Sequence, residues 1–292
     1  YGLSHSLLNR AVYDRQSDWL LSADQSYTSS SLKIEPETAD STSITYTVSM
    51  KGNEVTFRFR PRYYQKHRGL DYYEPWNYQV WKEPVAGWCS WFAYKTGITQ
   101  ENVREATDVL AETMKPYGLE YIQIDDGYQQ YGGTPEAWIN PNDKFPSGLG
   151  DLATYISSKG FRPGIWTNVA VHDSAWAYSH PDWFVRNADG TPASGRWIGY
   201  ILNGLDDEML DSVITPVYSR FRNDGWSYFK LDALRHLLFE GYNSHGSFFS
   251  GGYAEREKAF RNVVRRVREE TGRQNFLLAC WGVLPGVVGL AD

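Results

Sequence analysis

The spacing of apolar residues divides the sequence into two parts near residue 84. In the first part, residues 44–50 and 55–59 alternate apolar with polar side chains, and residues 51–54 between them carry the Gly and Asn of a tight turn. Period-two alternation is typical of a strand with one buried face. The pattern therefore predicts an antiparallel hairpin, within a small all-β piece and a connector that occupy the first ~80 residues.

In the second part, strand patterns alternate with helix patterns. Thr99 is a candidate N-cap for the first helix, which Pro116 and Gly118 end. Short connections between strands and helices imply a parallel sheet, either doubly wound or closed as a (β/α)₈ barrel. We expect strands at 85–91, 119–125, 162–168, 226–232 and 275–281, and further helices at 150–158, 208–222 and 254–271.

Two features favour the barrel. No Gly-x-Gly-x-x-Gly turn follows the first expected strand, which disfavours a dinucleotide-binding fold. Polar residues also gather where expected strands end, which is where barrel enzymes assemble their sites. These residues are Asp125, Asp126, Asp232 and the Cys280-Trp281 pair.

The last expected helix carries a basic run at residues 261–268. Phe260, Val263, Val264 and Val267 recur through it at helical spacing, so they predict one buried face. We interpret the arginines between them as the solvated outer face of the helix.

Composition adds a preference for a neutral ligand. A net charge of −6 argues against nucleic acid or an anionic membrane as the main partner, and 12 Trp and 21 Tyr suit either sugar faces or a large aromatic core. No apolar run approaches ~20 residues, so we expect a soluble protein, and a homo-oligomer is compatible with it. The only cysteines, Cys89 and Cys280, give neither a disulfide framework nor zinc spacing. The compartment stays open between cytoplasm and secreted or periplasmic space.

Lys230 and Asp232 form the first candidate site. Residues two apart on a strand project to the same face, so the ammonium and the carboxylate are expected to be neighbours. A nearby cation stabilises the ionised carboxylate, which is what a carboxylate nucleophile needs. An ordinary structural ion pair explains the same two residues.

Asp125 and Asp126 form the second candidate site, at the end of an apolar strand and before Gly127. Adjacent carboxylates repel, so we expect a ligand to satisfy them. Vicinal sugar hydroxyls could donate to both, and a divalent cation could bind both, although no further acidic cluster supports a metal. A simple turn motif is a third interpretation.

A series of short motifs, in order from about residue 84 to 281, resembles the melibiase group of α-galactosidases, glycoside hydrolase families thirty-six and twenty-seven. Each motif alone is weak, and jointly they are specific. They are Trp88-Cys89-Ser90-Trp91, Ile124-Asp125-Asp126-Gly127-Tyr128, Lys144-Phe145-Pro146-Ser147-Gly148-Leu149, Gly164-Ile165-Trp166, His180-Pro181-Asp182-Trp183, Gly204-Leu205-Asp206 and Lys230-Leu231-Asp232.

The resemblance implies a role for each matching residue. Asp232 would be the nucleophile that forms a covalent glycosyl-enzyme, and Lys230 would bond ring hydroxyls. Asp125 and Asp126 would hold the 4- and 6-hydroxyls of galactose. Trp166, Cys280 and Trp88 would complete the substrate site, although core packing explains Trp166 and Cys280 equally well. The resemblance implies a glycoside or oligosaccharide substrate and neither cofactor nor metal.

The second carboxyl of a retaining mechanism is not found in this sequence. Two carboxyls about 5 to 5.5 Å apart would flank the anomeric carbon. In the family, the acid/base Asp follows a sugar-binding Arg beyond the segment that corresponds to residues 275–281, and Asp292 is a poor candidate. We therefore expect about five of eight barrel units in residues 84–292, and part of a β-sandwich and a connector in residues 1–83. We also expect an isolated chain to be inactive or to depend on a partner piece.

Several functions stay open. Leu231 and the Ala233-Leu234-Arg235 sequence depart from the usual nucleophile motif, so N-acetylgalactosamine or β-L-arabinopyranose is compatible with the site. Transfer to another sugar is compatible too, and so is a non-catalytic carbohydrate-binding homologue. A lysine at a barrel strand end is also typical of Schiff-base lyases.

Overall fold

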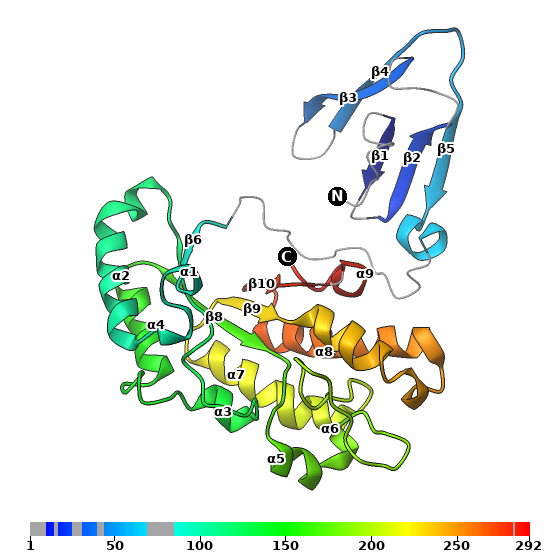
Figure 1. The fold of residues 1–292 in the computed structure, drawn as a ribbon. Helices are drawn as coiled ribbons and strands as arrows, with labels where there is room; N and C mark the ends of the chain where they lie inside the picture. The colour runs from blue at the N-terminus through cyan, green and yellow to red at the C-terminus, as the bar shows by residue number, and fades with distance from the viewer. Residues whose placement is uncertain (1–9, 15–16, 25–30, 40–43, 69–84, 283) are drawn as a thin grey trace. The chain divides into compact units, whose positions relative to one another are not determined.

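The computed structural model describes residues 10–14, 17–24, 31–39, 44–68, 85–282 and 284–292. The chain divides into two compact units, Tyr1–Val80 and Trp81–Asp292, which are described separately (Figure 1).

The described residues of the first unit form two small antiparallel sheets. A three-stranded sheet has the order β1-β2-β5, and a two-stranded sheet pairs β3 with β4. The strands are β1 (Ala11–Asp14), β2 (Trp19–Ala23), β3 (Leu32–Ala39), β4 (Ile44–Met50) and β5 (Phe57–Pro61), and a single π-helical turn, η2 (Tyr63–His67), follows them.

The hairpin expected from residues 44–59 is wrong. Both strands form, but β4 pairs with β3 and β5 pairs with β2, so the turn at 51–54 joins two different sheets. Met50 at the end of β4 and Phe57 at the start of β5 pack against one small core that contains Leu32. Alternation predicts which face of a strand is buried, but any amphipathic neighbour can satisfy that face. The alternation of apolar and polar residues therefore does not predict which strand β4 or β5 pairs with.

The second unit contains an all-parallel sheet whose five described strands follow one another in space in chain order. The order is β10-β9-β8-β7-β6, and each neighbouring pair is parallel. A doubly wound sheet reverses its strand order at a switch point, whereas a barrel winds in one direction. The expected α/β fold, part of a (β/α)₈ barrel, is confirmed. The strands are β6 (Gly87–Cys89), β7 (Tyr121–Ile124), β8 (Arg162–Asn168), β9 (Tyr228–Asp232) and β10 (Phe276–Ala279).

Helices lie along one side of this sheet (Figure 1). Thr99 caps α2 as predicted, because its hydroxyl accepts from the Asn102 amide, and the Thr99 amide donates to the Asn102 side-chain oxygen. The apolar faces of the helices join the outward side chains of the strands in one core. The helices are α1 (Trp91–Tyr94), α2 (Gln100–Thr113), α3 (Pro135–Ile139), α4 (Leu149–Ser158), α5 (Ser174–Ser179), α6 (Asp207–Met209), α7 (Thr215–Asn223), α8 (Gly252–Thr271) and α9 (Leu284–Val287).

Short helical turns of other types fill several connections. The helix expected at 208–222 is a run of α6, a π-helical segment and α7. The strand expected at 275–281 ends earlier, because Trp281 has a φ of 49° and the chain turns there. These turns are η3 (Lys95–Gly97), η4 (Lys115–Tyr117), η5 (Pro181–Trp183), η6 (Leu210–Ile214), η7 (His236–Asn243) and η8 (Gly246–Phe248).

The basic run of α8 is only partly the solvated face that we expected. Its apolar residues are buried as predicted, but Arg261 and Arg268 are buried too. Arg261 donates to the carbonyls of Gly286 and Val288, and Arg268 donates to that of Leu290. The segment after β10 packs on α8, and the two arginines donate to its backbone carbonyls, which need hydrogen-bond partners when they are buried.

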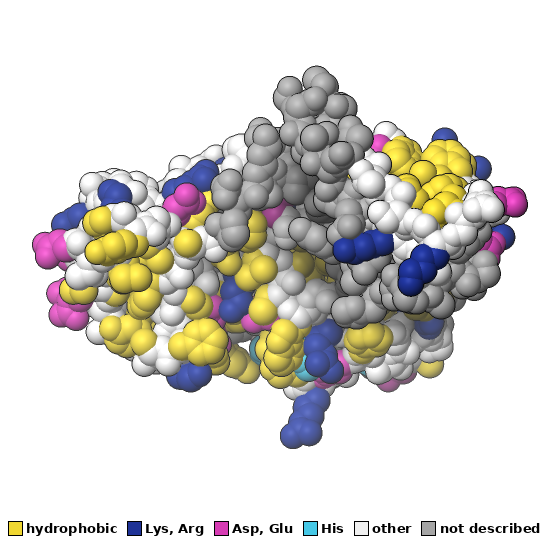
Figure 2. All heavy atoms as spheres, turned by 90° about the horizontal axis from the view of Figure 1, so that it is seen from above, with side chains coloured by type: hydrophobic (Ala, Val, Ile, Leu, Met, Phe, Trp, Pro, Cys, Tyr) yellow, Lys and Arg dark blue, Asp and Glu magenta, His cyan; other side chains and the backbone are white. Residues whose placement is uncertain are grey.

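None of the helices in the part of the chain that the structure describes combines the length and apolar character needed to cross a membrane. On the face drawn in Figure 2, acidic and basic side chains are interspersed rather than gathered by sign.

Candidate active site

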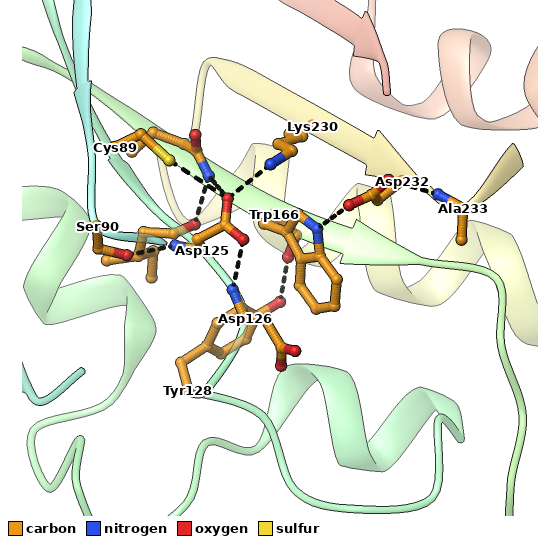
Figure 3. Close-up of polar contacts among 11 residues, drawn as sticks. Cys89, Ser90, Asp125, Asp126, Tyr128, Trp166, Lys230, Asp232 and Ala233 are labelled. Carbon is orange, nitrogen blue, oxygen red and sulfur yellow. Dashed lines mark hydrogen bonds and ion pairs between the residues drawn. The ribbon is translucent and has the colours of Figure 1, made fainter. Parts of the chain in front are cut away.

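The candidate site lies at the carboxyl ends of the parallel strands. Asp125 directly follows β7, and Asp232 is the last residue of β9. In the register of the sheet, Trp166 on β8 lies beside Lys230 on β9. Parallel strands end at the same edge of a sheet, so residues far apart in the sequence meet there (Figure 3).

Asp125 is the most enclosed member of the site, with 2% of its surface exposed. Its Oδ2 accepts from Gln123 Nε2 at 2.8 Å, Lys230 Nζ at 2.9 Å and Cys89 Sγ at 3.4 Å. Its backbone amide donates to Ser90 Oγ at 2.8 Å. A buried carboxylate needs such partners, because an unpaired charge is costly in the interior. Protein donors thus already occupy most of the acceptor capacity of Asp125.

The position of Lys230 on β9 suggested Asp232 as its neighbour. In the structure, the ion pair of Lys230 is with Asp125. Burial by itself lowers the pKa of Lys230, but the hydrogen bond to Asp125 and the attraction of the Asp125 charge together raise it, so the pKa lies above its usual value. The ammonium therefore stays charged at neutral pH. Burial acts on the nearby Cys89 thiol in the other direction and raises its pKa to about 11.

Asp232 is held by neutral donors. Its Oδ2 accepts from Trp166 Nε1 at 2.9 Å, and its Oδ1 accepts from the Ala233 amide at 2.7 Å (Figure 3). The Cys280 thiol also hydrogen-bonds to Asp232, and burial followed by this bond raises the pKa of Cys280 to about 11. Ala233 has a φ of 65°, a left-handed turn that bends the chain sharply after the carboxylate.

Asp126 lies beside Asp125, and its side chain points away from the lysine (Figure 3). Among the contacts of the described residues, its carboxylate accepts one hydrogen bond, from Gln129 Nε2 to Oδ1 at 2.6 Å. Burial raises the pKa of Asp126 above its usual value. Unlike Asp125, it keeps acceptor capacity for a ligand hydroxyl.

Trp166 is fixed from two sides. The Tyr128 hydroxyl donates to its carbonyl at 2.9 Å, and the Trp138 ring packs at 5.8 Å between centroids. This packing holds the indole nitrogen toward Asp232. The residue is therefore both part of the core and a hydrogen-bond donor to the candidate nucleophile, so the two interpretations of its role are compatible.

Trp88 makes packing contacts. It packs against the main core and meets the Tyr94 ring edge-on at 6.2 Å between centroids. Because side chains alternate along a strand, the next residue, Cys89, faces Asp125 instead. Sequence reasoning missed Cys89, Ser90 and Gln123 as partners of Asp125. Period-two spacing from Asp125 back to Gln123 was the available signal for one of them.

No group of three or more His, Cys, Asp or Glu side chains that could hold a metal ion occurs among the described residues. The site consists of carboxylates, a lysine and an indole donor at the carboxyl ends of the parallel strands.

The parallel strands follow one another in chain order and carry carboxylates at their carboxyl ends. These two features place the chain in the class of (β/α)-barrel proteins. The family model described as Melibiase matches residues 83–264, more than half of the 292 residues. The chain belongs to the melibiase family.

Curated relatives match over part of this barrel. An alpha-galactosidase from Oryza sativa subsp. japonica is 35% identical over 89 residues, which cover 30% of this chain and 21% of that protein. Alpha-galactosidase 2 from Pediococcus pentosaceus is 26% identical over 158 residues, covering 52% of this chain and 21% of that protein. The matched segment thus spans about a fifth of each relative.

Solved structures share the fold. TtGalA, an alpha-galactosidase from Thermus thermophilus in complex with p-nitrophenyl alpha-D-galactopyranoside, matches with a TM-score of 0.61 and 24% identity, over 97% of this chain and 54% of that one. A family 27 β-L-arabinopyranosidase from Geobacillus stearothermophilus matches with a TM-score of 0.52 and 17% identity, over 72% of this chain and 52% of that one.

Proposed function

We propose that this chain carries the galactose site of a retaining α-galactosidase of glycoside hydrolase family thirty-six, with Asp232 as the nucleophile. One observation carries the proposal. Asp232 ends a barrel strand with Oδ2 on the Trp166 indole and Oδ1 on a backbone amide, both neutral donors. Neutral donors fix the orientation of a carboxylate and leave it the negative charge with which it attacks.

The proposed chemistry follows from retention. An Asp232 oxygen forms a bond to the anomeric carbon while the bond to the leaving oxygen breaks, and a general acid protonates that oxygen. The same group then takes a proton from water, which displaces Asp232. We assign no described residue of this chain to the acid/base role.

Each of the surrounding residues binds a different part of the sugar. Asp126, which has spare acceptor capacity, accepts from the 4- and 6-hydroxyls. The Asp125–Lys230 pair presents a fixed ammonium, whose remaining hydrogens donate to ring oxygens. Trp166 and Cys280 line the part of the sugar pocket next to Asp232. Trp88 is part of β6 and packs against the core. The names of the curated relatives favour galactose.

The division of the chain is part of the same proposal. Residues 1–83 are the partial β-sandwich segment and connector, and residues 84–292 belong to the catalytic barrel.

A Schiff-base lyase fits the site poorly. Such an enzyme needs a lysine whose pKa is lowered, so that the neutral amine attacks a carbonyl. The ion pair with Asp125 has the opposite effect on the pKa of Lys230.

Covalent trapping tests the proposal. An activated 2-deoxy-2-fluoro-α-galactosyl donor carries a leaving group that departs without a general acid, so labelling requires only the nucleophile and the sugar pocket. After proteolysis, mass spectrometry should find the label on Asp232. Asp232→Asn should abolish labelling, and Asp189→Asn, at an exposed loop carboxylate, should not change it. A folded protein that stays unlabelled, or is labelled elsewhere, contradicts the assignment.

A further inference from the structure

Gln129 binds Asp126 through its side-chain amide. Its Nε2 donates to Asp126 Oδ1 at 2.6 Å, and its Oε1 accepts from the Gly127 backbone amide at 3.0 Å. A backbone N–H can only donate, so the Gly127 amide fixes which end of the Gln129 amide is the oxygen. The nitrogen then faces the carboxylate as a donor. Gln129 therefore links one oxygen of Asp126 to the backbone of the segment that follows β7.

The backbone around Gln129 is held by Asn142, which lies after α3. Asn142 Nδ2 donates to the Gly127 carbonyl at 2.9 Å and to the Gln129 carbonyl at 3.0 Å. The Asn142 backbone amide donates to the Tyr128 carbonyl at 2.8 Å. A Cβ at Gly127 would lie 2.7 Å from the Thr96 carbonyl oxygen, so the segment packs directly against the turn that contains Thr96. These contacts hold Gln129 in place independently of any ligand.

The contact with Gln129 occupies one Asp126 oxygen and leaves the other open. Oδ1 accepts from Gln129, and Oδ2 accepts no hydrogen bond among the residues that the structure describes. The Asp126 backbone is held as well, because its amide donates to Asp125 Oδ1 at 3.0 Å (Figure 3). The carboxylate therefore presents Oδ2 in one direction. A preorganised acceptor loses less conformational freedom when a hydroxyl binds to it, which favours affinity.

The same contact supports the negative charge of Asp126. Burial is the largest influence on the pKa of Asp126 and raises it, and the hydrogen bond from Gln129 opposes burial. The Asp125 and Asp232 charges raise the pKa further, whereas the Lys144 ammonium lowers it. Gln129 is thus a neutral donor that favours the ionised form, in which both oxygens accept hydrogen bonds.

We propose that Gln129 is a positioning residue for sugar binding, because it holds Asp126 with Oδ2 toward the hydroxyl that donates to it. This inference rests on the proposed function. Gln129 acts through Asp126 and takes no part in the reaction at the anomeric carbon. A side chain of the same shape that cannot donate should therefore weaken binding of the sugar and leave the attack by Asp232 unchanged.

Gln129→Glu has the required shape, and its effect should depend on pH. One oxygen of the new carboxyl can still accept from the Gly127 amide, but the ionised group faces Asp126 with a second negative charge and repels it. As pH falls, two neighbouring carboxyls share a single proton, because ionising both at once is costly. The protonated carboxyl then donates to Asp126, as the Gln129 amide does. Acid should therefore restore the contact.

Calorimetric titration with galactose measures the effect at two pH values. At each pH, the Kd of a variant is divided by the Kd of the unaltered chain. For Gln129→Glu we expect a ratio of about ten at pH about 8 and below about three at pH about 5.5. Gln129→Leu, which cannot donate at either pH, should give about ten at both. Gln130→Glu adds the same charge at the exposed neighbouring position and should stay below about two at both.

The rate of Asp232 labelling separates this role from a general disturbance of the site. At a saturating concentration of the fluorinated donor, the rate depends on the attack by Asp232 and not on affinity. In all three variants this maximal rate should stay within about threefold of the unaltered rate. The donor concentration that gives half the maximal rate should rise together with the Kd for galactose.

Two sets of outcomes distinguish this inference from the proposed function. If the unaltered chain binds galactose and is labelled on Asp232, three results overturn the role of Gln129 and leave the proposed function standing. These are unchanged binding by Gln129→Glu at pH about 8, equally weak binding at both pH values, and a maximal labelling rate that falls as far as affinity does. If the folded, unaltered chain neither binds galactose nor is labelled, the proposed function fails, and the role of Gln129 fails with it.

Discussion

Lys230 donates to Asp125, 105 positions earlier in the chain, across 2.9 Å, and thereby joins β9 to the end of β7. The side chains are 14% and 3% exposed, so neither charge has much contact with water. A buried ion pair need not stabilise the fold more than apolar residues of similar size would. Removing either partner, however, leaves the other charge buried and uncompensated. The pair therefore fixes the geometry of the site more than it strengthens the fold.

Breaking this pair from one side should be costly. Lys230→Met leaves the buried Asp125 carboxylate without its cation, and we expect a loss of about 3 kcal/mol in the free energy of unfolding, measured with urea. The double variant Lys230→Met/Asp125→Leu removes both charges and should recover most of that loss. A double variant as unstable as the single one would show that the pair itself contributes the stability.

Removing the indole donor should slow the attack by Asp232. Trp166→Phe keeps an aromatic ring but deletes the hydrogen bond to Oδ2, and a hydrogen bond to a charged group contributes about 1.5–3 kcal/mol. The rate of labelling by the fluorinated donor should fall about ten- to a hundredfold. Trp183→Phe, whose ring packs on His180, serves as the control. Equal labelling rates in the two variants would assign Trp166 to packing alone.

The sequence predicted the carboxyl-end cluster because short-range patterns specify it. Helical and strand periodicity placed β8 at its observed bounds, and the Thr99 cap was readable from residue types alone. Once parallel strands alternate with helices, residues at strand ends must converge. That is why the sequence alone predicts that Asp125 and Asp232 lie at the same edge of the sheet.

Pairing between distant residues was not predictable in the same way. Two-residue spacing suggested Asp232 as the partner of Lys230, but in the folded sheet Lys230 pairs with Asp125 at the end of β7. The β3–β4 and β2–β5 pairings likewise depend on which strands share a core. Local periodicity fixes which face a residue occupies, and only the assembled sheet fixes its neighbour.

Arg268, one of the two buried arginines of α8, gives a direct test of a second unpredicted contact. Arg268 is 2% exposed and donates to the Asp292 carboxylate and to the Leu290 and Asn275 carbonyls. Arg268→Met should lower the free energy of unfolding by about 3–5 kcal/mol, because it leaves a buried carboxylate unpaired. Arg265→Met, on the exposed face of the same helix, should stay within about 0.5 kcal/mol. Urea unfolding of both variants gives the comparison, and equal losses would contradict a special role for Arg268.

The stabilisation by Glu240 should depend on pH. Burial by itself raises the pKa of Glu240, but the Trp197 amide, His236 and the Ile198 amide lower it below its ordinary value of 4.5. A carboxyl whose pKa is lowered on folding stabilises the fold above the unfolded pKa, and the effect is lost as pH falls through the folded pKa. Thermal melts should therefore show Glu240→Gln melting about 2–4 °C below the unaltered chain at pH 6, with the gap closing below pH about 4. Glu112→Gln, at an exposed position of α2, should show no gap at either pH. A gap for Glu240→Gln that persists or widens in acid would mean that the carboxylate charge does not hold the Trp197 loop.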